Sequence, residues 1–546
     1  MRAFPANLII IFWFLVTGVA LISRSPLPVD ETRYLAVAWD MWINNNYLVP
    51  HLNGELYSHK PPLLFWLITL GWAIFGVSDW WPRLIGPLFG LGCIYLVFIF
   101  SKIVWPENIR IQRLAPLILF GCGFWTLFST LIMFDTVLSF FTLLAHLGIV
   151  LAWRERGIIG FLILALAIGL GGLTKGPVIL VHVLPVVLTV PLWGKRILGI
   201  NVNSDGYTLR WHGLVLVTLA LGISITLFWA ILAGLKGGQE YRDAIFWGQT
   251  IGRMSKSFAH QRDWWWYVPL LPLLIFPWII WPPVLRGLLT LKLKKSWDGG
   301  ALLCIIWFSS AFIFFSFVSG KQLHYLLPEV PALVLLIAKA LTNLDDVDTR
   351  HASLWLIGIC IVLTGFFVIF SPLLLSLFSS ITWLNEVNYG WGGLIILIGI
   401  FLQIKIDGDL EKNTQKLVIS MMSLIIIVHL VLSSVLYERY DLSDFSKQLK
   451  IWQDKGYALA NFGKYHGQYQ FLGRLLSPIS EIGVLAVQKE IFLKKYPKGR
   501  IIAYYKKVPS SAKPIISVPF RTKTIVVWEV DDFIKNPKLG DRLVNN

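Results

Sequence analysis

Residues 353–378 read SLWLIGICIVLTGFFVIFSPLLLSLF, a stretch without a single charged side chain. A run of ~17–25 apolar residues can cross the ~30 Å hydrocarbon core of a bilayer as a helix. Comparable runs recur along the chain from Leu8 to Leu436. We therefore expect an α-helical polytopic membrane protein whose main solvent is the bilayer.

The composition agrees with a membrane protein. Hydrophobic residues make up 56% of the 546 residues, against roughly 45–50% in soluble domains. The formal net charge is +17, but Lys and Arg are dispersed through short loops, so nucleic acid is not expected as a partner. No CxxC pair occurs, and all the cysteines fall within apolar runs, so neither a disulfide framework nor a cysteine metal site is expected. They are Cys93, Cys122, Cys304 and Cys360.

Charges and turn residues divide the apolar runs into about thirteen predicted transmembrane helices. They cover residues 8–22, 83–104, 114–128, 132–152, 158–172, 176–193, 213–235, 268–290, 301–318, 325–342, 353–378, 391–406 and 416–436. The apolar stretch 62–77 opens on Pro61-Pro62 and is expected to lie in the membrane interface. The first run resembles a signal peptide but lacks a small-residue cleavage site, so we interpret it as a retained helix.

The distribution of Lys and Arg predicts the orientation. With the N-terminus inside, the even-numbered connections are cytoplasmic and hold most of the basic residues, as the positive-inside rule requires. The outer connections include two long polar loops, residues 23–82 and 236–267. An odd number of helices then puts the C-terminus on the periplasmic or outer side of a bacterial inner membrane.

From about Tyr437 the composition becomes that of a soluble α/β module. Apolar periodicity predicts helices over 443–455 and 487–496, and strands over 457–462, 500–505 and 524–530. We divide the chain into a membrane domain, residues 1–436, and a small extracytoplasmic domain, residues 437–546. The second has no Gly-rich phosphate loop, and we assign it no chemistry.

The first outer loop carries two polar motifs. Asp30-Glu31-Thr32-Arg33-Tyr34 directly follows the first helix, and Tyr57-Ser58-His59-Lys60-Pro61-Pro62 precedes the interfacial stretch. Most single loop charges only solvate a helix end. Carboxylates, cations, aromatic rings and a rigid Pro-Pro together indicate a local site.

Further ionisable groups lie at predicted outer helix ends: Asp135, Lys175, and Lys321 with His324 and Tyr325. Charges at the membrane are costly, so a functional role is the default interpretation. The alternative is that Asp135 pairs with a lysine only to hold helices together.

The second outer loop is basic and ends in an aromatic run. Trp264-Trp265-Trp266-Tyr267 is typical of interface anchors. Basic side chains next to it suit a lipid phosphate, since Arg grips phosphate in two-point geometry and Lys offers a compact charge. The ionisable residues of this loop that suit such a site include Arg242, Arg253, Lys256, His260, Arg262 and Asp263.

Together these segments resemble bacterial GT-C glycosyltransferases related to the protein O-mannosyltransferases, most closely the aminoarabinose transferases that modify lipid A. The resemblance rests on the motifs at 30–34 and 57–62, on Leu52-Asn53-Gly54, on Arg83-Leu84, on Leu173-Thr174-Lys175-Gly176-Pro177 and on residues 321–328. It implies that Asp30 is the principal catalytic carboxylate, accompanied by Glu31 and a second acid, Asp135. The substrate-binding residues that it implies are Arg33, Tyr34, Tyr57, His59, Lys60, Arg83, Lys175, Arg262, Lys321, His324 and Tyr325.

Such enzymes move a sugar from a polyprenyl-phosphate carrier to an acceptor such as lipid A, usually with inversion. Lys60, Arg33 and Arg262 would stabilise the departing lipid phosphate. Asp30 would accept the proton of an attacking hydroxyl, or would orient an acceptor that is already an ionised phosphate. The resemblance leaves open the donor sugar and the choice between lipid A, protein and polysaccharide.

Other classes fit the residues less well. A lipid or solute transporter would hold its ionisable groups near the midplane, whereas these gather at one side. A non-catalytic scaffold leaves the acids and bases unexplained. His59 stands where relatives carry a glutamate, and with His51, Glu55 and His260 it raises the hypothesis of a zinc ion bridging the two loops. No HxxxH or CxxC spacing supports a preformed site, so no metal ligand is assigned.

Overall fold

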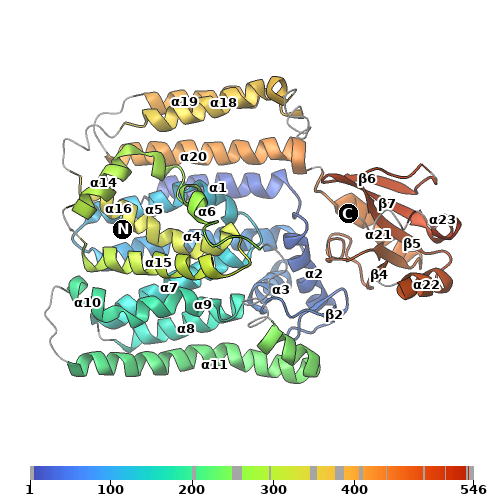
Figure 1. Ribbon diagram of the computed structural model, residues 1–546, viewed down its shortest axis with the longest axis horizontal. Coiled ribbons are helices and arrows are strands. Elements are labelled where there is room, and N and C mark those ends of the chain that lie inside the picture. Colours follow the sequence, from blue (N-terminus) through green and yellow to red (C-terminus); the bar gives the residue numbers. More distant parts are fainter. Residues whose placement is uncertain are drawn as a thin grey trace. The chain divides into compact units, whose positions relative to one another are not determined.

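The chain forms two compact units in a computed structural model (Figure 1). Unit 1 contains residues 1–22, 58–64 and 83–431, and unit 2 contains residues 23–57, 65–82 and 432–546. The structure describes residues 5–155, 157–198, 205–248, 261–293, 297–344, 353–375, 386–404, 410–437, 439–483, 486–510, 512–536 and 539.

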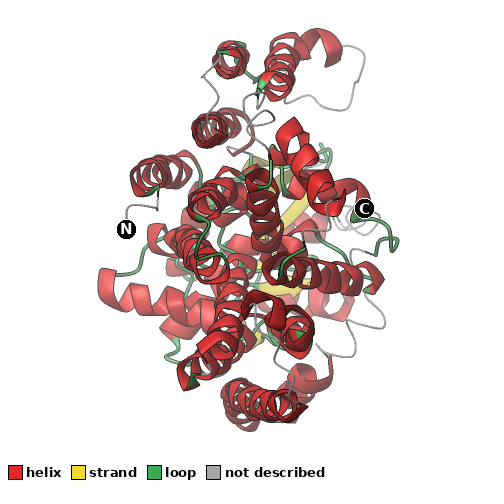
Figure 2. Cartoon of the chain, turned by 90° about the vertical axis from the view of Figure 1, so that its left-hand side faces the viewer, coloured by secondary structure: helices red, strands yellow, loops and turns green. Residues whose placement is uncertain are grey.

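Unit 1 is helical. Several of its helices are seen nearly end-on in Figure 2, so they run roughly alongside one another. Its helices are α1 (Ala6–Ser23), α4 (Trp80–Val104), α5 (Ile109–Gly121), α6 (Gly123–Ser129), α7 (Phe134–Glu155), α8 (Ile158–Lys175), α9 (Val178–Leu188), α10 (Val190–Leu198), α11 (Asp205–Asp243), η1 (Ala244–Gly248), η2 (Val268–Leu270), α13 (Leu271–Leu274), η3 (Trp278–Ile280), α14 (Pro282–Leu293), α15 (Gly299–Phe317), η4 (Leu323–Glu329), α16 (Val330–Thr342), α18 (Trp355–Leu375), α19 (Gly390–Gln403) and α20 (Leu410–Leu432).

Among the described residues, eight helices are long and apolar enough to cross a membrane. The number rises to ten if the bent pairs α5/α6 and α9/α10, with angles of 64° and 59°, each count as one span. Helices α3 (Leu63–Phe75), α18 and α19 contribute shorter apolar segments. The multi-pass helical architecture is thus confirmed, and the number thirteen stays a prediction.

The predicted span 268–290 is not one helix. It consists of η2, α13, η3 and α14 in succession. Five prolines interrupt it, and proline cannot donate the backbone hydrogen bond that a helix interior needs. Hydropathy identified the apolar run, but the interruptions of its helix are caused by the prolines, which hydropathy does not register.

Small residues allow close packing of α7 against α8. A Cβ atom on Gly160 of α8 would lie 2.2 Å from the backbone nitrogen of Ala152 on α7. Backbones approach this closely only at glycine, a common device between membrane helices. The two antiparallel helices therefore hold the start of α7 beside the end of α8.

Unit 2 combines a mixed sheet with helices. The sheet order is β4-β3-β5-β7-β6, in which β3 is parallel to β4 and β5, while β7 is antiparallel to β5 and β6. The strands are β3 (Leu459–Phe462), β4 (Ser480–Ile482), β5 (Arg500–Tyr505), β6 (Ile516–Phe520) and β7 (Lys523–Glu529). The helices are α2 (Asp30–Ile43), most of α3, α21 (Ser443–Asp454), α22 (Ala486–Lys495) and α23 (Val530–Lys535), and β1 (His51–Leu52) pairs with β2 (Glu55–Leu56). The small C-terminal α/β fold is confirmed, with both predicted helices and all three predicted strands.

Most of the first loop packs on the C-terminal segment within unit 2. Trp39 of α2 donates its indole hydrogen to the Leu475 carbonyl at 2.9 Å. The Trp72 ring stacks on Phe471 at 5.0 Å between centroids. The structure therefore groups most of residues 23–82 with residues 432–546, whereas the sequence predicted this loop as part of the membrane domain.

Candidate functional site

A buried carboxylate lies where three elements of unit 1 meet. Asp135 is in the first turn of α7, and Lys175 is the last residue of the adjacent helix α8. The Lys175 Nζ atom is 2.5 Å from Asp135 Oδ1, and the side chains are 12% and 4% exposed, respectively. From η4, His324 Nε2 approaches Asp135 Oδ2 at 3.9 Å. A buried carboxylate needs such partners, because an uncompensated charge is costly there.

Aromatic rings complete this arrangement, and we call Asp135, Lys175, His324 and Tyr325 the Asp135 site. The Lys175 ammonium lies 4.4 Å from the centroid of the Tyr325 ring, a cation–π geometry. His324 packs edge-on against the same ring at 5.0 Å. The Lys60 ammonium lies 5.4 Å from the Phe134 ring centre, and its charge also acts on Asp135. Two lysine ammonium groups, those of Lys175 and Lys60, therefore lie near one carboxylate, and the excess of positive charge favours an anionic ligand.

The second loop joins the segment before η4. Gln261 and Gly320 form an antiparallel bridge, and the Arg262 N–H donates to the Ser319 carbonyl at 3.1 Å. The Lys321 ammonium donates to the Arg262 carbonyl at 2.9 Å and to the Val318 carbonyl at 2.6 Å. Burial lowers the pKa of the Lys321 ammonium. Lys321 thus ties two backbone segments together.

The Arg262 side chain, unlike that of Lys321, points to the surface. It is exposed, and its Cζ atom lies 5.8 Å from the Trp266 ring centre. Its backbone, by contrast, is held by residues 319–321. The structure therefore brings together two segments that the sequence singled out separately, and leaves the Arg262 side chain available to a ligand.

The motif at the start of α2 lies in unit 2. Asp30 is 59% exposed and forms an ion pair with Arg33 one turn later. The Arg33 guanidinium lies 5.5 Å from the Tyr34 ring centre. Tyr34 and Tyr57 are buried and pack against the same ring, Phe65, at 6.5 and 6.2 Å. Asp30 is thus an accessible carboxylate next to a buried cluster of aromatic rings.

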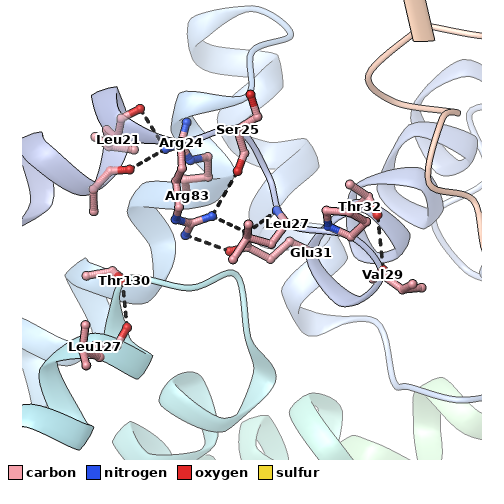
Figure 3. Close-up of polar contacts among 12 residues, drawn as sticks. Leu21, Arg24, Ser25, Leu27, Val29, Glu31, Thr32, Arg83, Leu127 and Thr130 are labelled. Carbon is pink, nitrogen blue, oxygen red and sulfur yellow. Dashed lines mark hydrogen bonds and ion pairs between the residues drawn. The ribbon is translucent and has the colours of Figure 1, made fainter. Parts of the chain in front are cut away.

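Glu31 and Arg83 hold backbone segments (Figure 3). Glu31 is 3% exposed, accepts from Arg24 Nη2 at 3.1 Å and from the Leu27 N–H at 2.6 Å. Arg83 donates to the carbonyls of Ala20 and Leu21 at 2.7 and 2.8 Å, at the C-terminal end of α1. These contacts differ from the catalytic role predicted for Glu31 and the substrate contact predicted for Arg83.

Three ionisable residues near these groups were not predicted from the sequence. His466 follows β3 in unit 2; burial lowers the pKa of its imidazole, and the charges of Arg33 and Lys464 lower it further. His182 and Glu329 form a buried pair in unit 1. The last two fall within predicted spans, where any ionisable residue is a functional candidate, so a signal existed for them. His466 carried none, because its proximity to Arg33 depends on the fold.

The zinc hypothesis has no cluster to support it in the described part of the chain. There, no group of three or more His, Cys, Asp and Glu residues could hold a metal ion. His59 is exposed, and His260, Arg253 and Lys256 lie outside the described residues.

Sequence comparisons place these features among known proteins. Residues 59–229 match the family described as dolichyl-phosphate-mannose-protein mannosyltransferase. The chain is 29% identical over 339 residues to undecaprenyl phosphate-alpha-4-amino-4-deoxy-L-arabinose arabinosyl transferase 2 of Pseudomonas fluorescens (strain Pf0-1), covering 58% of this chain and 55% of that protein. The corresponding transferase of Pseudomonas aeruginosa (strain UCBPP-PA14) is 28% identical over 328 residues, with 58% and 55% covered. The chain thus spans about half the length of these curated relatives.

The fold is that of ArnT. The crystal structure of ArnT from Cupriavidus metallidurans bound to undecaprenyl phosphate matches with a TM-score of 0.75 and 18% identity, covering 95% of this chain and 97% of that one. The apo structure matches with a TM-score of 0.71, covering 96% and 97%. The family match, the sequence relatives and this fold together confirm the resemblance to GT-C glycosyltransferases that the motifs indicated.

Proposed function

We propose that this protein is a membrane glycosyltransferase that moves a sugar from a polyprenyl-phosphate carrier to an acceptor in the bacterial envelope. The observation that carries the proposal is the Asp135 site, in which Lys175 and His324 surround a buried carboxylate at the ends of membrane helices. A protein of the same fold was crystallised with undecaprenyl phosphate. The names of the relatives include 4-amino-4-deoxy-L-arabinose, so we propose this sugar as donor. Lipid A is proposed as acceptor because the motifs resemble those of the transferases that modify lipid A.

The residues divide the chemistry between them. An acceptor oxygen attacks the anomeric carbon, the bond from that carbon to the phosphate oxygen breaks, and its electron pair leaves with polyprenyl phosphate. Lys60, Lys175 and Arg262 are proposed to stabilise the charge on the departing phosphate, and Arg33 to assist. Attack from the opposite face would invert the configuration.

Asp30 is proposed as the general base. Its exposure of 59% makes it accessible to an acceptor hydroxyl, whose proton it would take. If the acceptor is an ionised phosphate, no proton is transferred and Asp30 orients the acceptor instead. With Asp30 in this role, Asp135 would act mainly by holding Lys175 against Tyr325.

The location follows from the charge bias. We propose that the site and unit 2 face the periplasmic or outer side of the inner membrane, because Lys and Arg gather in the connections predicted as cytoplasmic. Membrane lipids and the lipid-linked donor are then the partners. A lipid or solute transporter is the second candidate, and a transferase acting on protein or polysaccharide is the third.

Mass spectrometry of lipid A, envelope glycans and envelope proteins tests the proposal, in cells that carry the wild-type chain or Asp30→Asn. We expect one class of molecule to gain a sugar with the wild type, and the variant to lose about 10²–10⁴-fold in rate if Asp30 is a base. Equal expression and equal thermal unfolding of the two proteins are the control. Unchanged masses, together with movement of lipid or solute across proteoliposomes, would favour the transporter.

A further inference from the structure

Two ionisable side chains lie deep in unit 1, away from the exposed residues used above. His182 of α9 and Glu329 at the end of η4 form a hydrogen bond between Nδ1 and Oε1, with side chains 1% and 0% exposed. Among the described residues, His182 Nε2 and Glu329 Oε2 have no further hydrogen-bond partner. Nothing in the proposed chemistry uses either group.

Stability alone does not explain this pair. Ionisable groups inside a membrane protein are costly, and a half-satisfied buried polar pair costs more than an apolar one. Replacing both members of a buried pair by apolar residues is often neutral or stabilising. The Phe315 ring lies 5.5 Å from the His182 ring, and Leu326 and Leu327 are fully buried, while the charges of Lys175 and Asp135 also act on His182. The best-attested use of such a pair is to fix the register of two elements.

Each partner sits on an element that leads directly to the Asp135 site. Lys175 ends α8, and Gly176, with φ of +72°, and Pro177 turn the chain into α9, where His182 lies. The turn is tight, because the Gly176 N–H donates to the Gly172 carbonyl at 2.8 Å. Glu329 ends the same short helix, η4, that carries His324 and Tyr325. A link between α9 and η4 therefore fixes Lys175 relative to His324.

We propose that His182 and Glu329 are a positioning pair that locks α9 to η4 and so sets the spacing of Lys175 and His324 around Asp135. The proposal rests on the proposed function for its catalytic consequence. Misplacement of a charged group by about 1 Å can cost about 10²-fold in rate. The two side chains are 1% and 0% exposed, so we expect their effect on catalysis to pass through Lys175 and His324.

The main test replaces both members, in His182→Leu/Glu329→Leu. The folded protein should survive, because both ionisable groups and their mutual hydrogen bond are removed together. We expect kcat to fall about 10- to 10²-fold, while KM for the lipid-linked donor stays within about twofold. Wild-type kcat in the folded double variant would overturn the proposal.

Two further variants keep the test decisive. Glu329→Gln retains an oxygen that accepts from His182, so most of kcat should remain; a loss as large as in the double variant would instead indicate a need for the carboxylate itself. His429→Leu is the matched control, because His429 is another buried histidine, on α20, a helix that carries neither member of the pair nor any residue of the Asp135 site. It should leave kcat unchanged.

A readout without substrate separates this proposal from the proposed function. Reductive methylation of lysines, followed by mass spectrometry, reports how well Lys175 is held against Asp135. We expect Lys175 to react several-fold faster in the double variant, and the exposed Lys494 to react equally in both proteins. If the wild type transfers no sugar but this difference is found, the proposed function fails and the positioning role stands. Equal Lys175 rates would overturn the positioning role whatever the activity.

Discussion

Asp30 and Glu31 are neighbours with opposite surroundings. Asp30 is 59% exposed beside Arg33, whereas Glu31 is buried and held by Arg24. We predict that Asp30→Asn removes activity and leaves thermal unfolding unchanged. We predict that Glu31→Gln keeps activity but lowers the unfolding temperature, because it removes the buried carboxylate that binds the Arg24 guanidinium, at a cost of about 3–5 kcal/mol.

Turnover and thermal unfolding of both purified variants check this contrast. The paired variant Arg24→Met/Glu31→Gln is the control, since removing both charges should restore much of the unfolding temperature. A stable Glu31→Gln protein without activity would mean that Glu31 takes part in the chemistry after all.

Among single residues, the sequence identified which ionisable side chains meet better than it identified the role of each one. Asp135, Lys175 and His324 stood out because ionisable residues are rare at the ends of apolar runs, and they do meet in the structure. Arg83 was expected to contact substrate only from the family resemblance, and in the structure it donates to the last carbonyls of α1. Whether an arginine meets a ligand or a helix end depends on contacts far along the chain, which no local pattern records.

At the scale of elements, Asn53 links the β1–β2 turn to the C-terminal segment. Its side chain exchanges two hydrogen bonds with the Ile479 backbone, each 2.8 Å, and its φ is +56°, which asparagine tolerates better than most residues. We predict that Asn53→Ala destabilises unit 2 by about 1–3 kcal/mol, because buried backbone groups lose their partners.

Hydrogen–deuterium exchange over residues 475–482 measures this loss, and exchange there should become faster. Asn45→Ala is the matched control, since Asn45 also has a positive φ of +49° but is exposed. Equal exchange in the two variants would mean that the Asn53 side chain does not hold these segments together.

Periodicity identified elements where it was long and regular. The predicted strands 500–505 and 524–530 correspond to β5 and β7, whose residues are largely buried. The pattern missed β4, which has three residues, and β6, an edge strand that contains Pro519. Short or proline-containing strands take their structure from a neighbour, so their own sequence predicts little.

At the scale of the whole molecule, the sequence could not foresee how the chain divides into units. Hydropathy separates membrane runs from polar ones, and it therefore assigned residues 23–82 to the domain in which they occur. In the structure, the contacts of Trp39, Asn53 and Trp72 with residues 471–479 group most of this loop with the C-terminal segment. Pairings of this kind join residues more than 400 positions apart in sequence, beyond the reach of local pattern.

The orientation of the whole chain is the last prediction. Lys and Arg predict that residues 105–113 are cytoplasmic and that the second loop and the C-terminal segment are outside. In intact spheroplasts, a membrane-impermeant maleimide should label Asp263→Cys and Lys455→Cys, both exposed positions, but not Glu107→Cys. Background is expected to be low, because Cys93, Cys122 and Cys304 are buried and Cys360 is partly so. All three introduced cysteines should react after permeabilisation, and labelling of Glu107→Cys in intact cells with protection of the other two would reverse the orientation and place the proposed site on the cytoplasmic face.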